Sequence, residues 1–131
     1  AMIHTTKTSH MAEDYFAKGG LTKGELITKI CFEIPSQGIY LKHTRASSTD
    51  AVVGVLVSRF EKRCRVAIVE GQRVAFLCPA LEAALGIRFH QDVYDRSHIP
   101  DGRLSYRADA SLDYQLNLVD VLCKKAIRDC A

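Results

Sequence analysis

Apolar and polar positions alternate between Ile27 and Ile34, with Ile30, Phe32 and Ile34 on one face. Alternation at every second residue predicts a half-buried strand, because successive side chains of a strand point to opposite faces. Pro35 ends this strand, since proline cannot donate to the hydrogen-bond ladder of a sheet.

A β-branched run over Val52–Phe60, interrupted by Gly54, predicts a central strand. The charged residues 61–63 form a tight connection, and Arg65–Val69 runs back as the partner strand of a hairpin. Arg73–Leu77 predicts a further strand of the same sheet.

Two helices follow the strands. Pro79–Gly86 carries proline in its first turn and glycine at its end, which are the residues preferred there. The last helix starts after Ser111, a capping residue, and its apolar face consists of Leu112, Leu116, Val119, Leu122, Cys123 and Ile127. Strands first and helices afterwards predict an α+β fold and exclude a parallel doubly wound sheet.

The length of 131 residues suits one domain. The polar residues 1–10 are expected to form a flexible N-terminal tail, and residues 11–131 a single domain. The net charge is only +3, and basic and acidic residues are interspersed along the chain, so the sequence does not indicate a nucleic-acid-binding surface. No secretory segment and no membrane-spanning apolar run is present, so we expect no membrane association.

The number of cysteines, five, is odd, and no two of them form a C-x-x-C pair. This pattern argues against a disulfide framework, a structural zinc site and an iron–sulfur cluster, and it fits a reducing cytoplasm. His90, Asp92 and His98 are loosely spaced and lack a fourth partner, so we predict no metal site.

The stretch from Tyr40 to Val55 holds the candidate binding residues, which are Tyr40, Lys42 and Arg45. An aromatic and two cations precede a polar loop of small residues, which leads into the central strand. A loop at the mouth of a buried strand is a common place to present groups to a ligand. No catalytic set of residues is evident, and we predict no catalytic residue in this chain.

Four segments resemble one known family. They are Glu13-Asp14-Tyr15-Phe16 with Leu21–Ile27; Tyr40-x-Lys42-x-x-Arg45 with Ala51-x-Val53-Gly54-Val55; Leu81–Gly86; and Ala110–Tyr114 with Leu118, Val121-Leu122 and Lys125-Ala126-Ile127. In this order and spacing they are similar to the C-terminal domain of the FAD-binding (medium) subunit of molybdenum hydroxylases. That family includes carbon monoxide dehydrogenase and xanthine dehydrogenase.

The resemblance implies a small antiparallel sheet of three or four strands packed on about three helices. It implies a flavoprotein subunit of an oxidoreductase, in which this domain covers FAD and contacts partner subunits during electron transfer. FAD would be held mainly by a separate N-terminal domain, and iron–sulfur and molybdenum subunits would be partners. Tyr40 matches the aromatic that lies against the flavin, and Lys42 and Arg45 match its cationic neighbours. A homo-oligomer is left open.

The chain also departs from the family pattern. Ala46 replaces a second arginine, Gln115 replaces the arginine after the helix tyrosine, and the order of Arg107 and Asp109 is reversed. No glycine-rich phosphate cradle occurs in the sequence. An alternative function is therefore a stand-alone, non-catalytic interaction or small-ligand-binding module descended from that domain.

Overall fold

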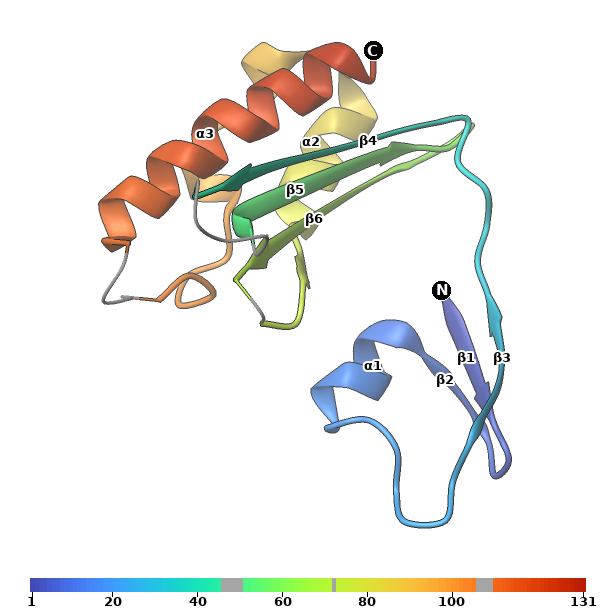
Figure 1. The fold of residues 1–131 in the computed structure, drawn as a ribbon. Coiled ribbons are helices and arrows are strands. Elements are labelled where there is room, and N and C mark those ends of the chain that lie inside the picture. The colour runs from blue at the N-terminus through green and yellow to red at the C-terminus, as the bar shows by residue number, and fades with distance from the viewer. Residues whose placement is uncertain (46–50, 72, 106–109) are drawn as a thin grey trace. The chain divides into compact units, whose positions relative to one another are not determined.

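The computed structural model describes residues 1–45, 51–71, 73–105 and 110–131. The chain divides into two compact units, unit 1 (Ala1–Ile34) and unit 2 (Pro35–Ala131). Each unit combines helix with an antiparallel sheet, so the fold is α+β, as the order of elements predicted (Figure 1). The boundary between the units lies at Pro35, whereas the sequence analysis expected one domain over residues 11–131.

Unit 1 contains a three-stranded antiparallel sheet in the order β2-β1-β3, formed by β2 (Ser9–Met11), β1 (Met2–Thr5) and β3 (Ile27–Cys31). The short helix α1 (Ala12–Ala17) follows β2 directly. Residues 1–10, where the sequence predicted a flexible tail, thus supply two of the three strands. The pairing of β1 with β3 is a contact between distant parts of the sequence, which the polar residues of this segment do not reveal.

A hydrogen-bonded carboxylate braces the connection before β3. The backbone N–H and hydroxyl of Thr22 donate to Oε2 of Glu25 at 3.0 and 2.6 Å, and the Thr5 hydroxyl donates to Oε1. These bonds favour the charged form and lower the pKa of Glu25 to about 2. The carboxylate joins the start of the sheet to the loop that precedes β3.

Strand β3 is present but ends at Cys31 instead of Ile34, and its expected burial is wrong. Ile30, Phe32 and Ile34 are 55%, 71% and 82% exposed. The physical reason is that the helix of unit 1 is too short to cover these side chains, because α1 has six residues and only its Tyr15 is buried. Alternation identified the shared face without showing that anything packs on it.

Unit 2 is built on an antiparallel four-stranded sheet in the order β4-β5-β6-β7. Its strands are β4 (Gln37–Thr44), β5 (Ala51–Arg59), β6 (Cys64–Glu70) and β7 (Phe76–Leu77). The predicted central strand and hairpin are confirmed, since β5 lies between β4 and β6.

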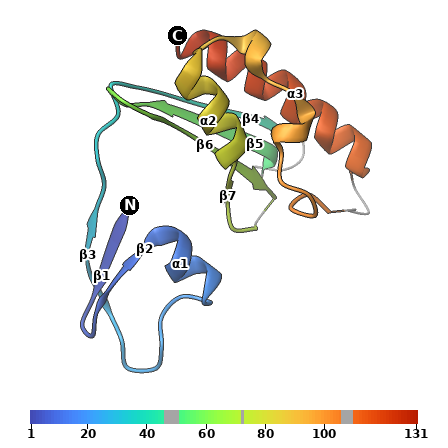
Figure 2. The ribbon, with the colours of Figure 1, turned by 180° about the vertical axis from the view of Figure 1, so that it is seen from behind.

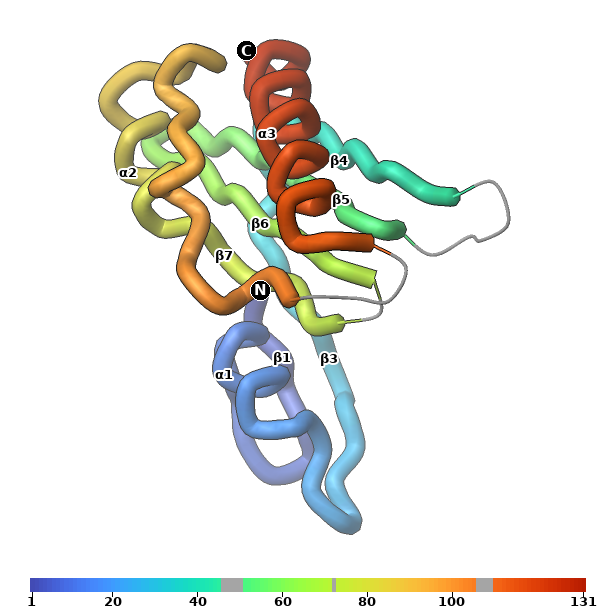
Figure 3. Tube along the Cα trace, turned by 90° about the vertical axis from the view of Figure 1, so that its left-hand side faces the viewer, coloured from blue at the N-terminus to red at the C-terminus, as the bar shows by residue number. Residues whose placement is uncertain are grey.

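Helices α2 (Pro79–Ile87) and α3 (Leu112–Asp129) pack on the same face of this sheet (Figures 2 and 3). Two short 3-10 helices, η1 (Gln91–Val93) and η2 (Arg96–His98), lie between them in sequence. Ser111 caps α3 as predicted, its hydroxyl accepting from the N–H of Tyr114 at 3.3 Å. No described helix is long and apolar enough to cross a membrane.

The core of unit 2 lies between the sheet and these helices. Fully buried side chains on its two sides include Val53, Val55, Val57, Val66, Ile68, Leu81, Leu85, Val119 and Ile127. Close burial of this set holds the sheet rigid and leaves its other face free to present side chains.

Candidate functional site

The register of the sheet sorts the side chains of unit 2 onto two faces. On β5, Val53, Val55 and Val57 point to the helices, so Gly54, Leu56 and Ser58 point to the opposite face. Neither α2 nor α3 covers that second face, which we call the open face (Figure 2).

Three rows of paired residues cross the open face. The first holds Tyr40, Leu56, Ala67 and Leu77, the second holds Lys42, Gly54 and Val69, and the third holds Gly38, Ser58 and Arg65. Tyr40 is 52% exposed and Leu56 is 39% exposed. The open face therefore carries apolar side chains together with one aromatic ring and one lysine, and Arg65, which pairs with Glu82, lies in its third row.

Gly54 explains how Tyr40 is held. A Cβ atom at Gly54 would lie 2.4 Å from the Tyr40 hydroxyl oxygen and 2.8 Å from Cγ1 of Val69. The outer end of the tyrosine ring thus lies directly over the glycine backbone. Glycine inside a strand often marks such a close approach, and this signal was present in the sequence.

The predicted trio of binding residues is only partly brought together. Tyr40 and Lys42 are two residues apart on β4 and share the open face. Arg45 is exposed and follows the end of β4, beyond a register shift at His43/Thr44, so strand alternation does not assign it to that face. Residues 46–50 and 106–109 carry two of the three departures from the family pattern, at Ala46 and at Arg107 and Asp109, and they lie outside the described residues.

A polar cluster on the helix side was missed by sequence reasoning. Glu70 is 1% exposed and accepts from the N–H and hydroxyl of Ser105 at 3.3 and 3.2 Å. Gln115 of α3 donates to the carbonyl of Ser105 at 2.8 Å and to that of Ala110 at 3.0 Å. The cluster ties the segment before α3 to the end of β6, which is a structural role.

A shallow pocket of about 450 Å³ lies beside the first half of α3. Its lining consists of Arg96, Ser97, Ile99, Pro100, Asp101, Gly102, Leu104, Leu112 and Leu116. Arg96 forms an ion pair with Asp120 and donates to Oδ1 of Asn117. Its positive charge is therefore largely neutralised within the fold. The sequence showed only weak periodicity here and did not predict a pocket.

The buried thiols of unit 2 are poor nucleophiles. Burial, with a smaller contribution from Glu82, raises the pKa of Cys78 to about 12. Burial also raises the pKa of Cys123, Cys64 and Cys130. A raised pKa keeps the thiol protonated, and the thiolate is the reactive form. Within the described parts of the chain, no three His, Cys, Asp or Glu side chains are grouped to hold a metal ion.

Together these features define the chain as a small α+β protein whose four-stranded sheet is helix-covered on one face and presents Tyr40 and Lys42 on the other. Comparison of the chain with family models, curated proteins and solved structures finds no match.

Proposed function

We propose that this chain is the C-terminal domain of an FAD-binding subunit of a molybdenum hydroxylase-type oxidoreductase. In this function the open face covers the flavin, while an N-terminal domain holds most of FAD. Iron–sulfur and molybdenum subunits are its partners in electron transfer, and its location is the cytoplasm. The chain is not catalytic alone, because the redox chemistry belongs to the flavin.

The observation that carries the proposal is the placement of Tyr40 and Lys42 side by side on the open face. A half-exposed tyrosine braced on Gly54 can lie against a flat ring system, exclude water from it and fix its orientation. A nearby lysine favours the anionic flavin or its phosphates through charge-assisted hydrogen bonds. Arg45, at the end of the same strand, would add positive charge to the approach of the ligand.

The test is a titration of the purified chain with FAD and with riboflavin, followed by quenching of flavin fluorescence. We expect weak, saturable binding in the millimolar range, which corresponds to about 4 kcal/mol. Tyr40→Ala should weaken binding of both ligands about 3- to 10-fold, the value of one aromatic contact. Lys42→Ala should weaken FAD more than riboflavin, because riboflavin has no phosphate.

Tyr114→Ala is the matched control, since Tyr114 is a similarly exposed tyrosine on α3, away from the open face. It should bind both ligands like the unmodified chain. Quenching that is equally strong in Tyr40→Ala, or absent up to about 1 mM FAD, would contradict flavin contact by this chain.

A second candidate function is a stand-alone interaction or small-ligand-binding module. It is favoured by the apolar part of the open face, where Leu56, Val69 and Leu77 are at least partly exposed. An apolar surface with a polar edge suits a protein partner as well as a flavin. If the folded, unmodified chain does not bind FAD in the titration, that result would favour this second function.

A further inference from the structure

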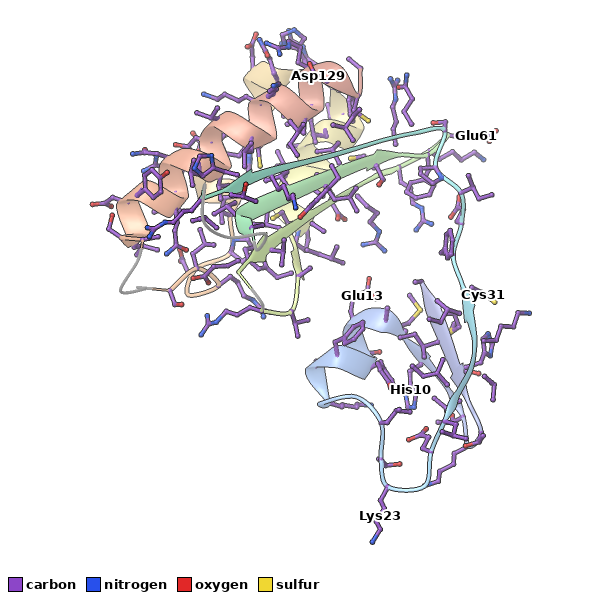
Figure 4. All side chains as sticks on the ribbon, in the orientation of Figure 1. His10, Glu13, Lys23, Cys31, Glu61 and Asp129 are labelled. Atoms are coloured by element: carbon purple, nitrogen blue, oxygen red, sulfur yellow. The ribbon has the colours of Figure 1, made fainter. Side chains whose placement is uncertain are left out.

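Unit 1 leaves an apolar edge without cover. In the order β2-β1-β3, β3 is an edge strand, and β1 is its one strand partner in the described part of unit 1. An exposed edge presents backbone donors and acceptors to another strand. Figure 4 labels Cys31 at the end of β3, where β1 begins opposite it.

Five apolar side chains on β3 or beside it in sequence are exposed, interspersed with Thr28, Lys29 and Glu33. They are Leu26 (66%), Ile27 (42%), Ile30 (55%), Phe32 (71%) and Ile34 (82%). The buried apolar side chains of unit 1 are Ile3 and Tyr15 alone among its described residues. Contiguous exposed apolar surface of this kind marks a site of association.

The segment Thr28–Ile34 comprises the last four residues of β3 and the three residues that follow it, and it is self-complementary about Cys31. When two copies run antiparallel with Cys31 opposite Cys31, Ile30 of each chain faces Phe32 of the other. In the same register Lys29 of each chain faces Glu33 of the other. Apolar pairs therefore meet on one face and opposite charges meet twice on the other, which are favourable cross-strand pairs.

We propose that β3 is a docking edge for a second copy of this chain, joined antiparallel about Cys31 into a continuous six-stranded sheet. Such a pairing is isologous, so each contact occurs twice and the assembly closes as a dimer. The inference concerns unit 1 and does not rest on flavin binding by unit 2.

The available area agrees with a dimer. A large apolar side chain offers on the order of 150–200 Å², so the exposed fractions of the five residues amount to roughly 600 Å² per chain. A standard interface buries about 800 Å² per partner, and the paired backbones would supply the remainder.

Charge variants test the register. Lys29→Glu alone places Glu opposite Glu twice, and Glu33→Lys alone places Lys opposite Lys twice. We expect sedimentation equilibrium to show each single variant dimerising about 10-fold or more weakly than the unmodified chain. An equimolar mixture of the two variants restores both opposite-charge pairs and should dimerise like the unmodified chain. Lys62→Glu, in the exposed β5–β6 turn, is the matched control for an altered net charge.

Cross-linking tests the centre of the pairing. Directly opposite residues of antiparallel strands have Cα atoms about 4.5 or 5.5 Å apart, within the range of a disulfide. With diamide as oxidant, two Cys31 thiols should form one disulfide, and diamide takes up the two electrons and two protons. Cys31→Ser should abolish the cross-linked dimer, since the other four cysteines are buried.

The proposal is overturned if the unmodified chain stays monomeric at high micromolar concentration. It is also overturned if the mixture of charge variants associates no better than each variant alone. If the chain stays monomeric and its β3 edge pairs with a strand of a different protein, the proposal of a second copy is likewise overturned.

Discussion

Gly54 lies beneath the Tyr40 ring, and because glycine has no side chain it leaves room for that ring on the open face. In Gly54→Ala the new Cβ would meet the Tyr40 hydroxyl at 2.4 Å and Cγ1 of Val69 at 2.8 Å, so both must move. We expect a loss of about 1 kcal/mol in the free energy of unfolding in urea, typical of mild overpacking. FAD binding should weaken with it.

The double variant Gly54→Ala/Tyr40→Ala provides the control for this contact. Because the two residues touch, their effects on stability should be less than additive. Additive effects, or a stabilising Gly54→Ala, would show that the ring does not depend on this glycine.

Glu25 should make unit 1 sensitive to acid. Its pKa is lowered from 4.5 to about 2, chiefly by the hydroxyl of Thr22 and then by that of Thr5. The stabilisation from the carboxylate is therefore complete above about pH 4.5 and is lost as the pH falls toward 2. The protection of the β1 and β3 amides against hydrogen exchange, measured relative to the intrinsic exchange rate at each pH, should fall across this window. Glu25→Gln should show faster exchange at pH 7 and a weaker dependence on pH, and an unchanged profile would refute the role of the carboxylate.

Among the elements, the segment η1–η2 depends on one buried hydroxyl for its attachment to α3. Tyr94 donates to Oδ1 of Asp120 at 2.7 Å, and Arg96 also pairs with Asp120. Burial, and then this hydrogen bond to Asp120, raise the pKa of Tyr94, so the hydroxyl stays protonated and remains a donor. Tyr94→Phe should lower the free energy of unfolding by about 1.5–3 kcal/mol, the range for a hydrogen bond to a charged group.

Tyr114→Phe serves as the comparison for Tyr94→Phe. Its hydroxyl meets Nε2 of His43 at 3.1 Å in an exposed position. Surface changes of this kind usually alter stability by less than about 0.5 kcal/mol. Equal losses in the two variants, measured by urea unfolding, would contradict a special contribution of Tyr94.

For the whole molecule, the two units should differ in stability. Unit 1 spans 34 residues and buries Ile3 and Tyr15, whereas the remaining buried apolar side chains of the described chain belong to unit 2. Segments of fewer than about 40 residues seldom fold stably without further support. At low protein concentration, brief proteolysis should therefore remove residues before Pro35 and leave unit 2 intact. Equal resistance of both units in dilute solution would contradict this order of stability.

Strand β5, its hairpin with β6 and the helices α2 and α3 were predictable because their signals are local. Proline at the start of α2 and Ser111 before α3 satisfy or avoid unpaired N–H groups within one turn. The β-branched run of β5 packs well in a central strand wherever it occurs. The α+β class follows from the order of these elements and is confirmed by the structure.

The site was predictable only in part. The sequence singled out Tyr40 and Lys42, but only the pairing of β4 with β5 showed that they share one face of the sheet. The sequence did not reveal that Gly54 supports the ring, or that Glu70, Ser105 and Gln115 form a cluster, because these residues meet only through strand pairing and helix packing.

The sequence by itself determined β5, its hairpin with β6 and the helices α2 and α3, since propensity, capping and periodicity act over a few neighbouring residues. It did not predict β4. Only the tertiary structure decided that Met2–Thr5 pair with β3, that the apolar side chains of β3 are exposed, and that α2 and α3 cover the same face of the sheet in unit 2. Burial depends on what lies across from a side chain, and that neighbour comes from a distant part of the chain.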